Sequence, residues 1–429
     1  MELIRKFLFI ILIVNICWAC VPTKHNEGAT LTAIKHVAVV DVTNGTLLID
    51  QTILIQEENI LSVGPSSTIK IPVKTNIVDA QGKYVIPGLW DMHVHLDMAG
   101  EESLPYFIAN GVTGVRDMGT DQLDTLKRWR REVEQGQRIG PHIITAGPML
   151  DGPFFVDIFR ITVKTEDEAR AAVDSLVAQG VDFIKIHQQI TREAYFAAAD
   201  QAQKHGISFV GHKPNVVSTL EVVEAGQKSI EHIIGIPDSS QVSFSYIKEK
   251  GAWVTPTLVL IDKLANYHSL VAEQDARMPF VSASLKEAWK KQTEAWGEGV
   301  DKTVSMMQEI KPLMLERTIQ LHKKGVGLLA GTDLGVPYIF PGSSLHEELE
   351  LYVKSGMSPL DALRTATINP AKFLKMEETI GSVQEGKIAD LVVLDSNPLE
   401  DISSIRNIVT VVFKGRVYER NRTGTIKIK

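Results

Sequence analysis

Cysteine is nearly absent from this sequence: the 429 residues include only Cys17 and Cys20. Both fall in an N-terminal segment with a basic start and an apolar run, residues 7–16, that is too short and too early for an ordinary membrane span. Such a segment is typical of an export signal, which we predict at residues 1–19. Cleavage after Ala19 would leave a single thiol, so an internal disulfide is excluded in the mature chain.

A lone cysteine at the start of an exported bacterial protein indicates lipid attachment. Cleavage after Ala19 would make Cys20 that residue, and the stretch ICWAC loosely resembles a lipoprotein signal box. Plain secretion is the alternative, because Cys17 and Trp18 stand where such boxes prefer Leu and a small residue. We expect a lipoprotein of a bacterial envelope, in the periplasm or at the cell surface. It would touch the membrane only through the anchor on Cys20, with residues 20–30 as a tether.

Basic residues are also too few for a nucleic-acid partner. The chain has 45 Lys and Arg against 52 Asp and Glu, its formal net charge is −7, and no basic stripe interrupts the sequence. A content of 44% hydrophobic and 23% charged residues is typical of a globular protein and excludes a disordered or fibrous one. The oligomeric state is left open by these numbers.

Two kinds of segment divide the chain. Residues 31–85 consist of short β-like runs with turns at Asn44-Gly45 and Gly64-Pro65, and residues 384–429 have the same texture. We predict one small composite β-sandwich domain built from both chain ends. Between them, residues 86–383 form the predicted barrel domain, whose first strand begins at the junction, because strand-like runs alternate with helical stretches in an α/β pattern. The runs are YVIPGLWDMHVH, GVTGVRDMG, HIITAGP, DFIKIH, ISFVGHK, SIEHIIG, WVTPTLVL and VGLLAGTDL.

These eight runs separated by helices predict a (β/α)8 TIM-type barrel. The connection between the seventh and eighth runs, residues 261–325, is much longer than the others. Such a length indicates extra helices, which would lie beside the barrel mouth and could serve as a lid.

A lysine stands in the middle of the fourth strand-like run, FIKIHQQ. Alternation puts Phe183, Lys185 and His187 on one face and Ile184 and Ile186 on the other, so both faces look covered. Desolvation and nearby cations lower the pKa of a buried amine, and the neutral amine can add carbon dioxide. The resulting carbamate is an anion that can bridge two metals. Pairing of the lysine with a carboxylate is the alternative.

Metal-ligand residue types gather at the ends of the runs. His93 and His95 end the first run, His212 the fifth, His232 the sixth and Asp333 the eighth. Because the C-terminal ends of barrel strands meet at one mouth, these side chains should become neighbours. Imidazole and carboxylate are ligands for a zinc-type cation. Any one of these histidines could instead satisfy a core hydrogen bond, but five such residues at strand ends favour a metal site.

In this ordered set of motifs, the sequence resembles the amidohydrolase superfamily, and more narrowly its imidazolonepropionase-like and prolidase-like group. The resemblance covers nearly the whole chain. It rests on IPGLWDMHVHL, FIKI, FVGHKP, SIEHI, AGTDLG, LHEELELYVKSGMSPLDALRTATINPAKFL and GSVQEGKIADLVVLDSNPLEDI.

The resemblance implies a binuclear metal site and a hydrolytic reaction. A metal-bridging hydroxide would attack a carbonyl carbon, and Asp333 would move the proton from the nucleophile to the leaving nitrogen. We expect two divalent ions, zinc by ligand type, with manganese or cobalt as replacements. One metal would be held by His93, His95 and Asp333 and the other by His212 and His232, with carboxylated Lys185 as the bridge.

One departure from the superfamily pattern narrows the reaction. Mononuclear deaminases of the superfamily place a Glu three residues after the fifth-strand histidine, but here His212 is followed by Lys213, Pro214 and Asn215. The missing acid favours amide hydrolysis over deamination and counts against a true imidazolonepropionase.

Substrate contacts should come from the loops that follow the strands. His187 shares the face of the buried lysine and is expected to line the pocket, with a role as a metal ligand as the alternative. Arg160 could bind a substrate carboxylate, and Tyr267 could donate to a carbonyl oxygen. Arg160 and Tyr267 could equally be packing or surface residues. His142, at the start of the third run, is expected to be structural. His346, at the start of a later helix, is expected to cap or pack, with substrate contact as the alternative.

The sequence therefore predicts an exported metal-dependent hydrolase that cleaves a carbon–nitrogen bond. An Xaa-Pro dipeptide or an N-acyl amino acid is the leading substrate class. A cyclic amidase, a lactonase or a phosphotriesterase-like hydrolase is the alternative enzyme, because the same metal pair attacks all these electrophiles. A metal-containing surface binding lipoprotein without turnover is the alternative that is not an enzyme.

Overall fold

The computed structural model describes residues 30–153, 159–237, 244–273, 275–420 and 426–428. The predicted export signal and Cys20 lie outside these residues. No helix in the described ranges is long and apolar enough to cross a membrane.

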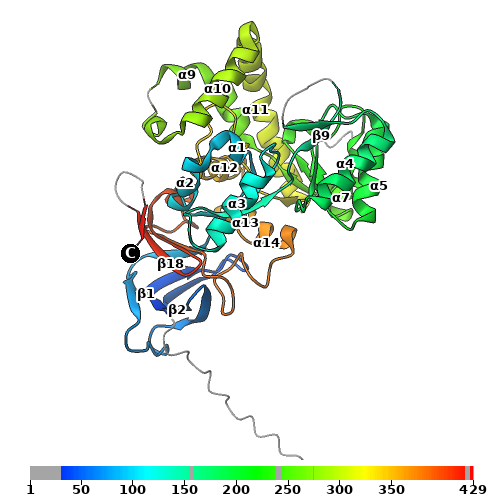
Figure 1. The fold of residues 1–429 in the computed structure, drawn as a ribbon. Helices are drawn as coiled ribbons and strands as arrows, with labels where there is room; N and C mark the ends of the chain where they lie inside the picture. The colour runs from blue at the N-terminus through cyan, green and yellow to red at the C-terminus, as the bar shows by residue number, and fades with distance from the viewer. Residues whose placement is uncertain (1–29, 154–158, 238–243, 274, 421–425, 429) are drawn as a thin grey trace, which may run out of the picture.

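Strands from both ends of the chain share one nine-stranded sheet. In Figure 1 the first strands, in blue, lie beside the last strands, in red. Antiparallel pairing of β5 with β16 joins the two ends, since Tyr84 lies opposite Leu394 and Pro87 opposite Leu391. The sheet runs β19-β18-β17-β16-β5-β1-β2-β3, with β4 paired to β1. Its strands are β1 (Leu31–Val40), β2 (Leu47–Gln56), β3 (Asn59–Pro65), β4 (Asn76–Asp79), β5 (Tyr84–Pro87), β16 (Leu391–Leu394), β17 (Ile408–Phe413), β18 (Arg416–Arg420) and β19 (Ile426–Ile428).

The two predicted turns of this sheet fared differently. Asn44 and Gly45 do form a turn between β1 and β2, where Gly45 has φ +82° and donates its N–H to the Asp41 carbonyl at 2.7 Å. The turn predicted at Gly64-Pro65 is wrong, because β3 continues through Pro65 and the chain turns only after it. The sandwich arrangement and the exact domain bounds stay predictions.

The middle of the chain fits a TIM-type barrel of parallel strands. Each of the eight predicted runs contains one of them. Backbone hydrogen bonds link the eighth run to the first, from the Asp333 N–H to the His93 carbonyl at 2.8 Å, and the third to the fourth, from Asp182 to Thr145 at 3.0 Å. The strands are β6 (Leu89–Val94), β7 (Val112–Asp117), β8 (His142–Thr145), β11 (Ile184–Ile186), β12 (Phe209–Gly211), β13 (Ser229–Glu231), β14 (Trp253–Thr255) and β15 (Gly327–Leu328). Two further strands extend this sheet: β9 (Met149–Asp151) lies beside β11, and β10 (Arg160–Thr162) lies beside β9.

The helices around the barrel follow the apolar periodicity of the sequence, as α4 illustrates. Its N-terminus has a capping box, in which the Thr165 hydroxyl accepts from the Glu168 N–H at 3.2 Å and the Glu168 carboxylate accepts from the Thr165 N–H at 3.1 Å. Such a cap stabilises a helix by about 1 kcal/mol. The buried face consists of Ala169, Ala172, Val173 and Leu176.

Fourteen helices lie in the described residues. They are α1 (Leu96–Ala99), α2 (Leu104–Ala109), α3 (Leu123–Glu134), α4 (Glu166–Ala178), α5 (Arg192–Lys204), α6 (Thr219–Glu224), α7 (Phe244–Glu249), α8 (Leu258–Ala265), α9 (Tyr267–Ala272), α10 (Ala283–Trp296), α11 (Val300–Lys323), α12 (Ser343–Lys354), α13 (Pro359–Thr365) and α14 (Ile368–Leu374).

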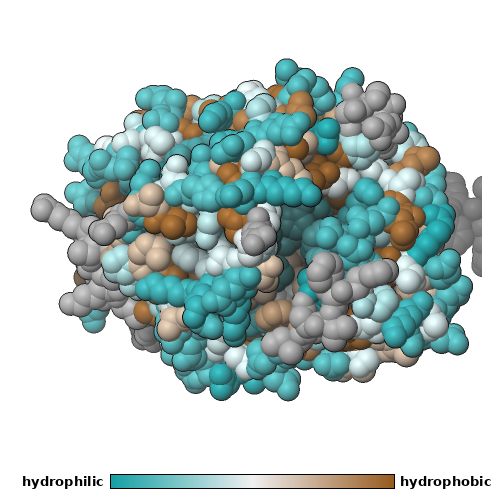
Figure 2. All heavy atoms as spheres, turned by 90° about the horizontal axis from the view of Figure 1, so that it is seen from above, coloured by the Kyte–Doolittle hydropathy of each residue, from teal (hydrophilic) through white to brown (hydrophobic). Residues whose placement is uncertain are grey.

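The long connection after the seventh strand contains extra helices, as its length predicted. Helices α9, α10 and α11 project at the top of Figure 1. Two hydrogen bonds tie α10 and its N-cap to segments that follow β6 and β15: the Ser282 hydroxyl donates to the Ala99 carbonyl at 2.5 Å, and Gln292 donates to the Gly335 carbonyl at 2.8 Å. These helices, which we call the insertion, therefore lie beside the mouth of the barrel. Figure 2, seen from above, shows a hollow near the centre of this face, rimmed largely by hydrophilic residues.

Two histidines that we expected to be structural hold parts of the fold together. His142, in β8, lies 2.8 Å from the Asp390 carboxylate beside β16, and its ring stacks on Trp90. His346 is buried in α12 and lies 2.9 Å from the Asn110 carbonyl. The first contact joins the barrel to the terminal sheet, and the second joins α12 to α2.

Candidate active site

Four of the predicted ligands surround one point at the barrel mouth. The Nε2 atoms of His93 and His95 lie 3.3 and 3.4 Å from the same Asp333 carboxylate oxygen. Ligand atoms of His93, His232 and Asp333 all lie within 4.8 Å of one another. Residues 240 positions apart thus form a group that could hold a metal ion, in the way that convergent strand ends predict.

The fifth predicted ligand, His212, extends this group, because its ring lies in a row of imidazole rings. The ring centroid of His232 lies 4.7 Å from that of His93 and 4.5 Å from that of His212, and His212 lies 4.2 Å from His187. Burial lowers the pKa of His212 well below the usual histidine value and that of His232 to about 4. Both rings are therefore neutral near pH 7, which is the form that binds metals.

Asp333 is ionised in this group. Burial alone would raise its pKa, but the neighbouring His93 and His232 hold the pKa of Asp333 well below its usual range. A carboxylate in this state can accept a proton or bind a cation.

Lys185 is fully buried in β11, and among the described residues none forms a hydrogen bond with its Nζ. Burial lowers the pKa of Lys185 to about 8, while the charges of Glu231 and Asp333 act in the opposite direction. Its charge in turn lowers the pKa of His93, His212 and His232, so the amine lies within electrostatic reach of the ligand group. Burying an amine without a hydrogen-bond partner costs free energy, unless a bound group supplies the missing interaction.

Backbone strain marks the ends of three strands. His232, Thr257 and Asp333 are not glycine, yet they have φ values of +65°, +50° and +63°. The Thr257 hydroxyl lies 2.8 Å from Nδ1 of His232 and fixes that ring. Left-handed backbone at such residues costs free energy and persists where the surrounding structure enforces it, most often at functional sites.

Sequence reasoning missed a buried ion pair behind His93. The Glu231 carboxylate lies 2.9 Å from Nδ1 of His93 and accepts hydrogen bonds of 2.8 and 2.9 Å from Arg116 Nη2. Glu231 thereby fixes the tautomer of His93 and leaves Nε2 facing Asp333. The available signal was a charged residue within each of two predicted strand-like runs, GVTGVRDMG and SIEHIIG.

Replacing Arg116 with Leu should lower the free energy of unfolding by about 3–5 kcal/mol, because the Glu231 carboxylate would stay buried without its counter-charge. Arg116 is fully buried and also donates to the Met92 carbonyl at 2.6 Å. Chemical denaturation measures the change. The control is Arg128→Leu on the exposed side of α3, whose ion pair with Glu132 at 3.8 Å should contribute less than about 1 kcal/mol. Equal losses in the two variants would contradict the prediction.

The first strand is fixed to the eighth by a buried aspartate. Asp91 accepts hydrogen bonds from the His93 N–H at 3.2 Å and from the Thr332 N–H and hydroxyl at 3.0 and 2.7 Å. Burial raises the pKa of Asp91 to about 7. Asp91 thus shapes the strand that presents His93 and His95.

The predicted substrate contacts lie in two places. His187 Nδ1 and Arg160 Nε lie 2.8 and 3.2 Å from the same oxygen of Asp151, which is buried at the end of β9. Arg160 also lowers the pKa of Lys185, so it lies near the ligand group. Tyr267 lies in an aromatic cluster, with its ring 6.0 Å from that of Trp296 and 5.9 Å from that of Tyr338 in the loop after β15.

Comparison with known protein families shows to which family this chain belongs. The model of the amidohydrolase family matches residues 84–418. The chain belongs to the amidohydrolase family. An imidazolonepropionase and a putative prolidase are among the proteins it resembles. This membership makes it a hydrolase of carbon–nitrogen bonds, and the cluster of His93, His232 and Asp333 agrees with metal binding.

Individual relatives of this amidohydrolase are distant but cover most of it. It is 23% identical to an ochratoxinase from Aspergillus niger over 77% of this chain and 74% of that one. It is 24% identical to an imidazolonepropionase from Fusobacterium nucleatum over 80% of this chain and 84% of that one. Among solved structures, an Xaa-Pro dipeptidase with bound methionine shares its fold, with a TM-score of 0.73 and 22% identity over 91% of this chain and all of the other.

Proposed function

We propose that this amidohydrolase is a binuclear metal enzyme that cleaves an open-chain amide. The residues fit such a centre, because neutral imidazoles and an ionised carboxylate lie within electrostatic reach of a buried amine that has no hydrogen-bond partner among the described residues. That unpartnered Lys185 Nζ is the observation that carries the proposal: as a carbamate it would gain the partners it lacks. His93, His95 and Asp333 would hold one divalent ion, His212 and His232 the second, and carboxylated Lys185 both.

The reaction chemistry divides between the ions and this chain. When bound, zinc or a similar cation would polarise the scissile carbonyl and make a water molecule more acidic. Asp333 would take the proton of the attacking water and deliver it to the leaving nitrogen. Glu231 would hold His93, and Thr257 would hold His232, in the tautomers that leave their other nitrogens for the site.

A substrate with a free carboxylate fits the mouth. Asp151 orients both Arg160 and His187 there, and a guanidinium is well suited to bind a carboxylate. An Xaa-Pro dipeptide or an N-acyl amino acid has such a group beside the scissile amide. The fold shared with an Xaa-Pro dipeptidase supports the dipeptide as the substrate class. We also propose export and anchoring at Cys20, which would suit scavenging of peptides outside the cytoplasm.

The test is product release from a panel of amides by zinc-loaded protein that lacks residues 1–19, with Asp333→Asn as the blank. The panel contains Xaa-Pro dipeptides, dipeptides without proline and N-acyl amino acids, each beside its C-terminal amide. A second panel contains cyclic amides, lactones and phosphotriesters. Cleavage by the wild type alone, with a preference for the free carboxylate, supports the proposal. Cleavage only of cyclic amides, lactones or phosphotriesters moves the function to that class. A metal-loaded protein that hydrolyses none of them would be a binding protein.

A further inference from the structure

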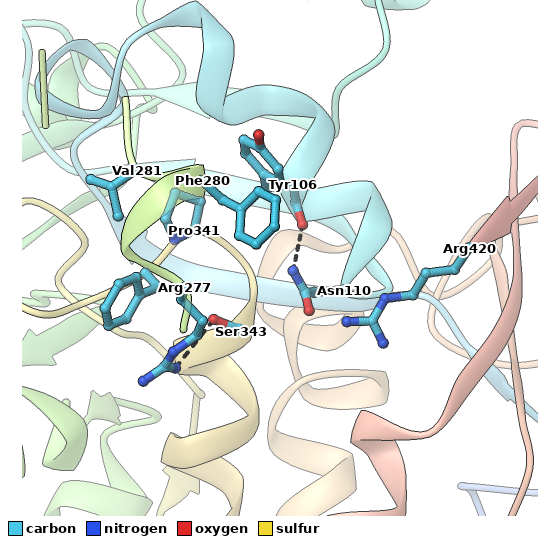
Figure 3. Close-up of a pocket in the computed structure, with 9 residues that line it drawn as sticks. Tyr106, Asn110, Arg277, Phe280, Val281, Pro341, Ser343 and Arg420 are labelled. Carbon is cyan, nitrogen blue, oxygen red and sulfur yellow. Dashed lines mark hydrogen bonds between the residues drawn. The ribbon is translucent and has the colours of Figure 1, made fainter. Parts of the chain in front are cut away.

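A second cavity, of about 130 Å³, lies where three parts of the fold meet (Figure 3). Its walls come from α2, from the segment between α9 and α10, from the loop before α12 and the start of that helix, and from the end of β18. None of the proposed metal ligands lines it. The lining residues that matter are Tyr106, Asn110, Arg277, Phe280, Phe340 and Arg420.

One wall of this cavity has a guanidinium for which the described part of the chain provides no counter-charge. Arg420, the last residue of β18, donates from Nη1 to the Arg406 carbonyl at 3.1 Å, but its buried Nε has no hydrogen-bond partner among the residues that the structure describes. Burial lowers the pKa of Arg420, and no carboxylate in the described ranges offsets that shift. The adjoining residues 421–425, NRTGT, include no acidic residue. A buried, unused donor on a cation favours an anionic acceptor.

The second guanidinium at the cavity is already neutralised. Arg277 lies 2.7 Å from an Asp275 carboxylate oxygen and 3.1 Å from a Glu347 oxygen, and its guanidinium stacks 3.9 Å above the ring of Phe340. Arg277 therefore forms part of the wall, and the excess positive charge comes from Arg420. The charge of Arg420 also acts on His346: burial, together with the charges of Arg406 and Arg420, lowers the pKa of His346 to about 3.

The opposite walls are aromatic. The rings of Tyr106 and Phe280 lie 5.9 Å apart, and Phe340 lines the same cavity. A volume of 130 Å³ is below the range of about 300–1,000 Å³ typical of sites for drug-sized ligands, so the cavity suits a molecule of a single ring. We propose that it binds an aromatic carboxylate of the size of benzoate, with the carboxylate on Arg420 and the ring beside Tyr106 and Phe280. The site does not depend on the proposed reaction.

Isothermal titration of the full chain with benzoate tests this site. We expect a Kd of about 1 mM or tighter, given the affinity that so few ligand atoms can supply. Arg420→Met should weaken binding about tenfold or more, because a charge-assisted hydrogen bond is lost. The matched control is Arg416→Met, on the same strand, whose side chain donates to the Gly136 carbonyl and does not line the cavity. Its affinity should equal that of the wild type.

A second variant and a second probe guard against loss of folding in Arg420→Met. Phe280→Ala removes an aromatic ring from a different element and should also weaken benzoate, while neutral benzamide should bind the wild type more weakly than benzoate does. Thermal unfolding confirms that each variant is folded. If benzoate bound at the metal centre instead, neither substitution would change its affinity. Equal affinity in wild type, Arg420→Met and Phe280→Ala would therefore overturn the proposal, as would the absence of benzoate binding to the wild type.

Discussion

Replacing Asp333 with Asn is expected to lower kcat/KM about 10²–10⁴-fold, the range that a positioned general acid or base supplies. The amide of Asn can still place an oxygen near His93 and His95, but it cannot take a proton from water. In the wild type the carboxylate is ionised, because His93 and His232 hold its pKa below the usual range. Turnover of the best amide substrate measures the effect, and metal content is determined on the same samples.

The matched control for this change is Asp395→Asn in the terminal sheet. Asp395 is half exposed, pairs with Lys83 and is not among the proposed metal ligands or substrate contacts. Its replacement should therefore leave kcat/KM unchanged. Metal content separates the two roles of Asp333. Full metal with lost turnover assigns the proton transfer, whereas lost metal assigns the ligand role. An Asp333→Asn enzyme that keeps wild-type turnover would contradict both roles.

The barrel and its ligand group could be predicted because both depend on local sequence. Each strand is a short apolar run with its chemistry at the C-terminal end, and the period of two puts His93 and His95 on one face. The parallel arrangement then brings distant strand ends together without further information, as the contacts of Asp333 with both histidines show. Lys185 was predictable for the same reason, since a charge on a strand with two covered faces must be buried.

The parts that sequence reasoning missed depend on packing between distant strands. Arg116 and Glu231 are 115 residues apart, and no local pattern says which buried charge will face which. The orientation of Arg160 by Asp151 likewise arises only because β10 pairs in parallel with β9, placing Arg160 opposite Met149. A loop residue that looks free in sequence is thus fixed by a carboxylate of the neighbouring strand. The same limit explains Gly64-Pro65, where pairing with β2 extends β3 through the predicted turn.

Replacing Lys185 with Ala is expected to remove more than 99% of the activity, since even the loss of an outer partner of a metal ligand costs about 10–100-fold. The variant lacks the amine that would become the bridging carbamate, and its cavity is open to a small acid. Acetate or propionate should therefore restore part of the activity and of the bound metal. Activity and metal content, each measured with and without the acid, check this result.

The control for the rescue is Lys263→Ala. Lys263 is also buried, but its Nζ has a partner, the Glu347 carboxylate at 2.9 Å, and it lies in α8 outside the ligand group. Its loss should reduce stability without removing metal, and short acids should have no effect on it. If Lys185 served only as an ordinary buried cation, Lys185→Ala would keep its metal and most of its turnover. If short acids stimulated both variants equally, the rescue would not arise at the metal site, and the proposal of a carbamate on Lys185 would be wrong.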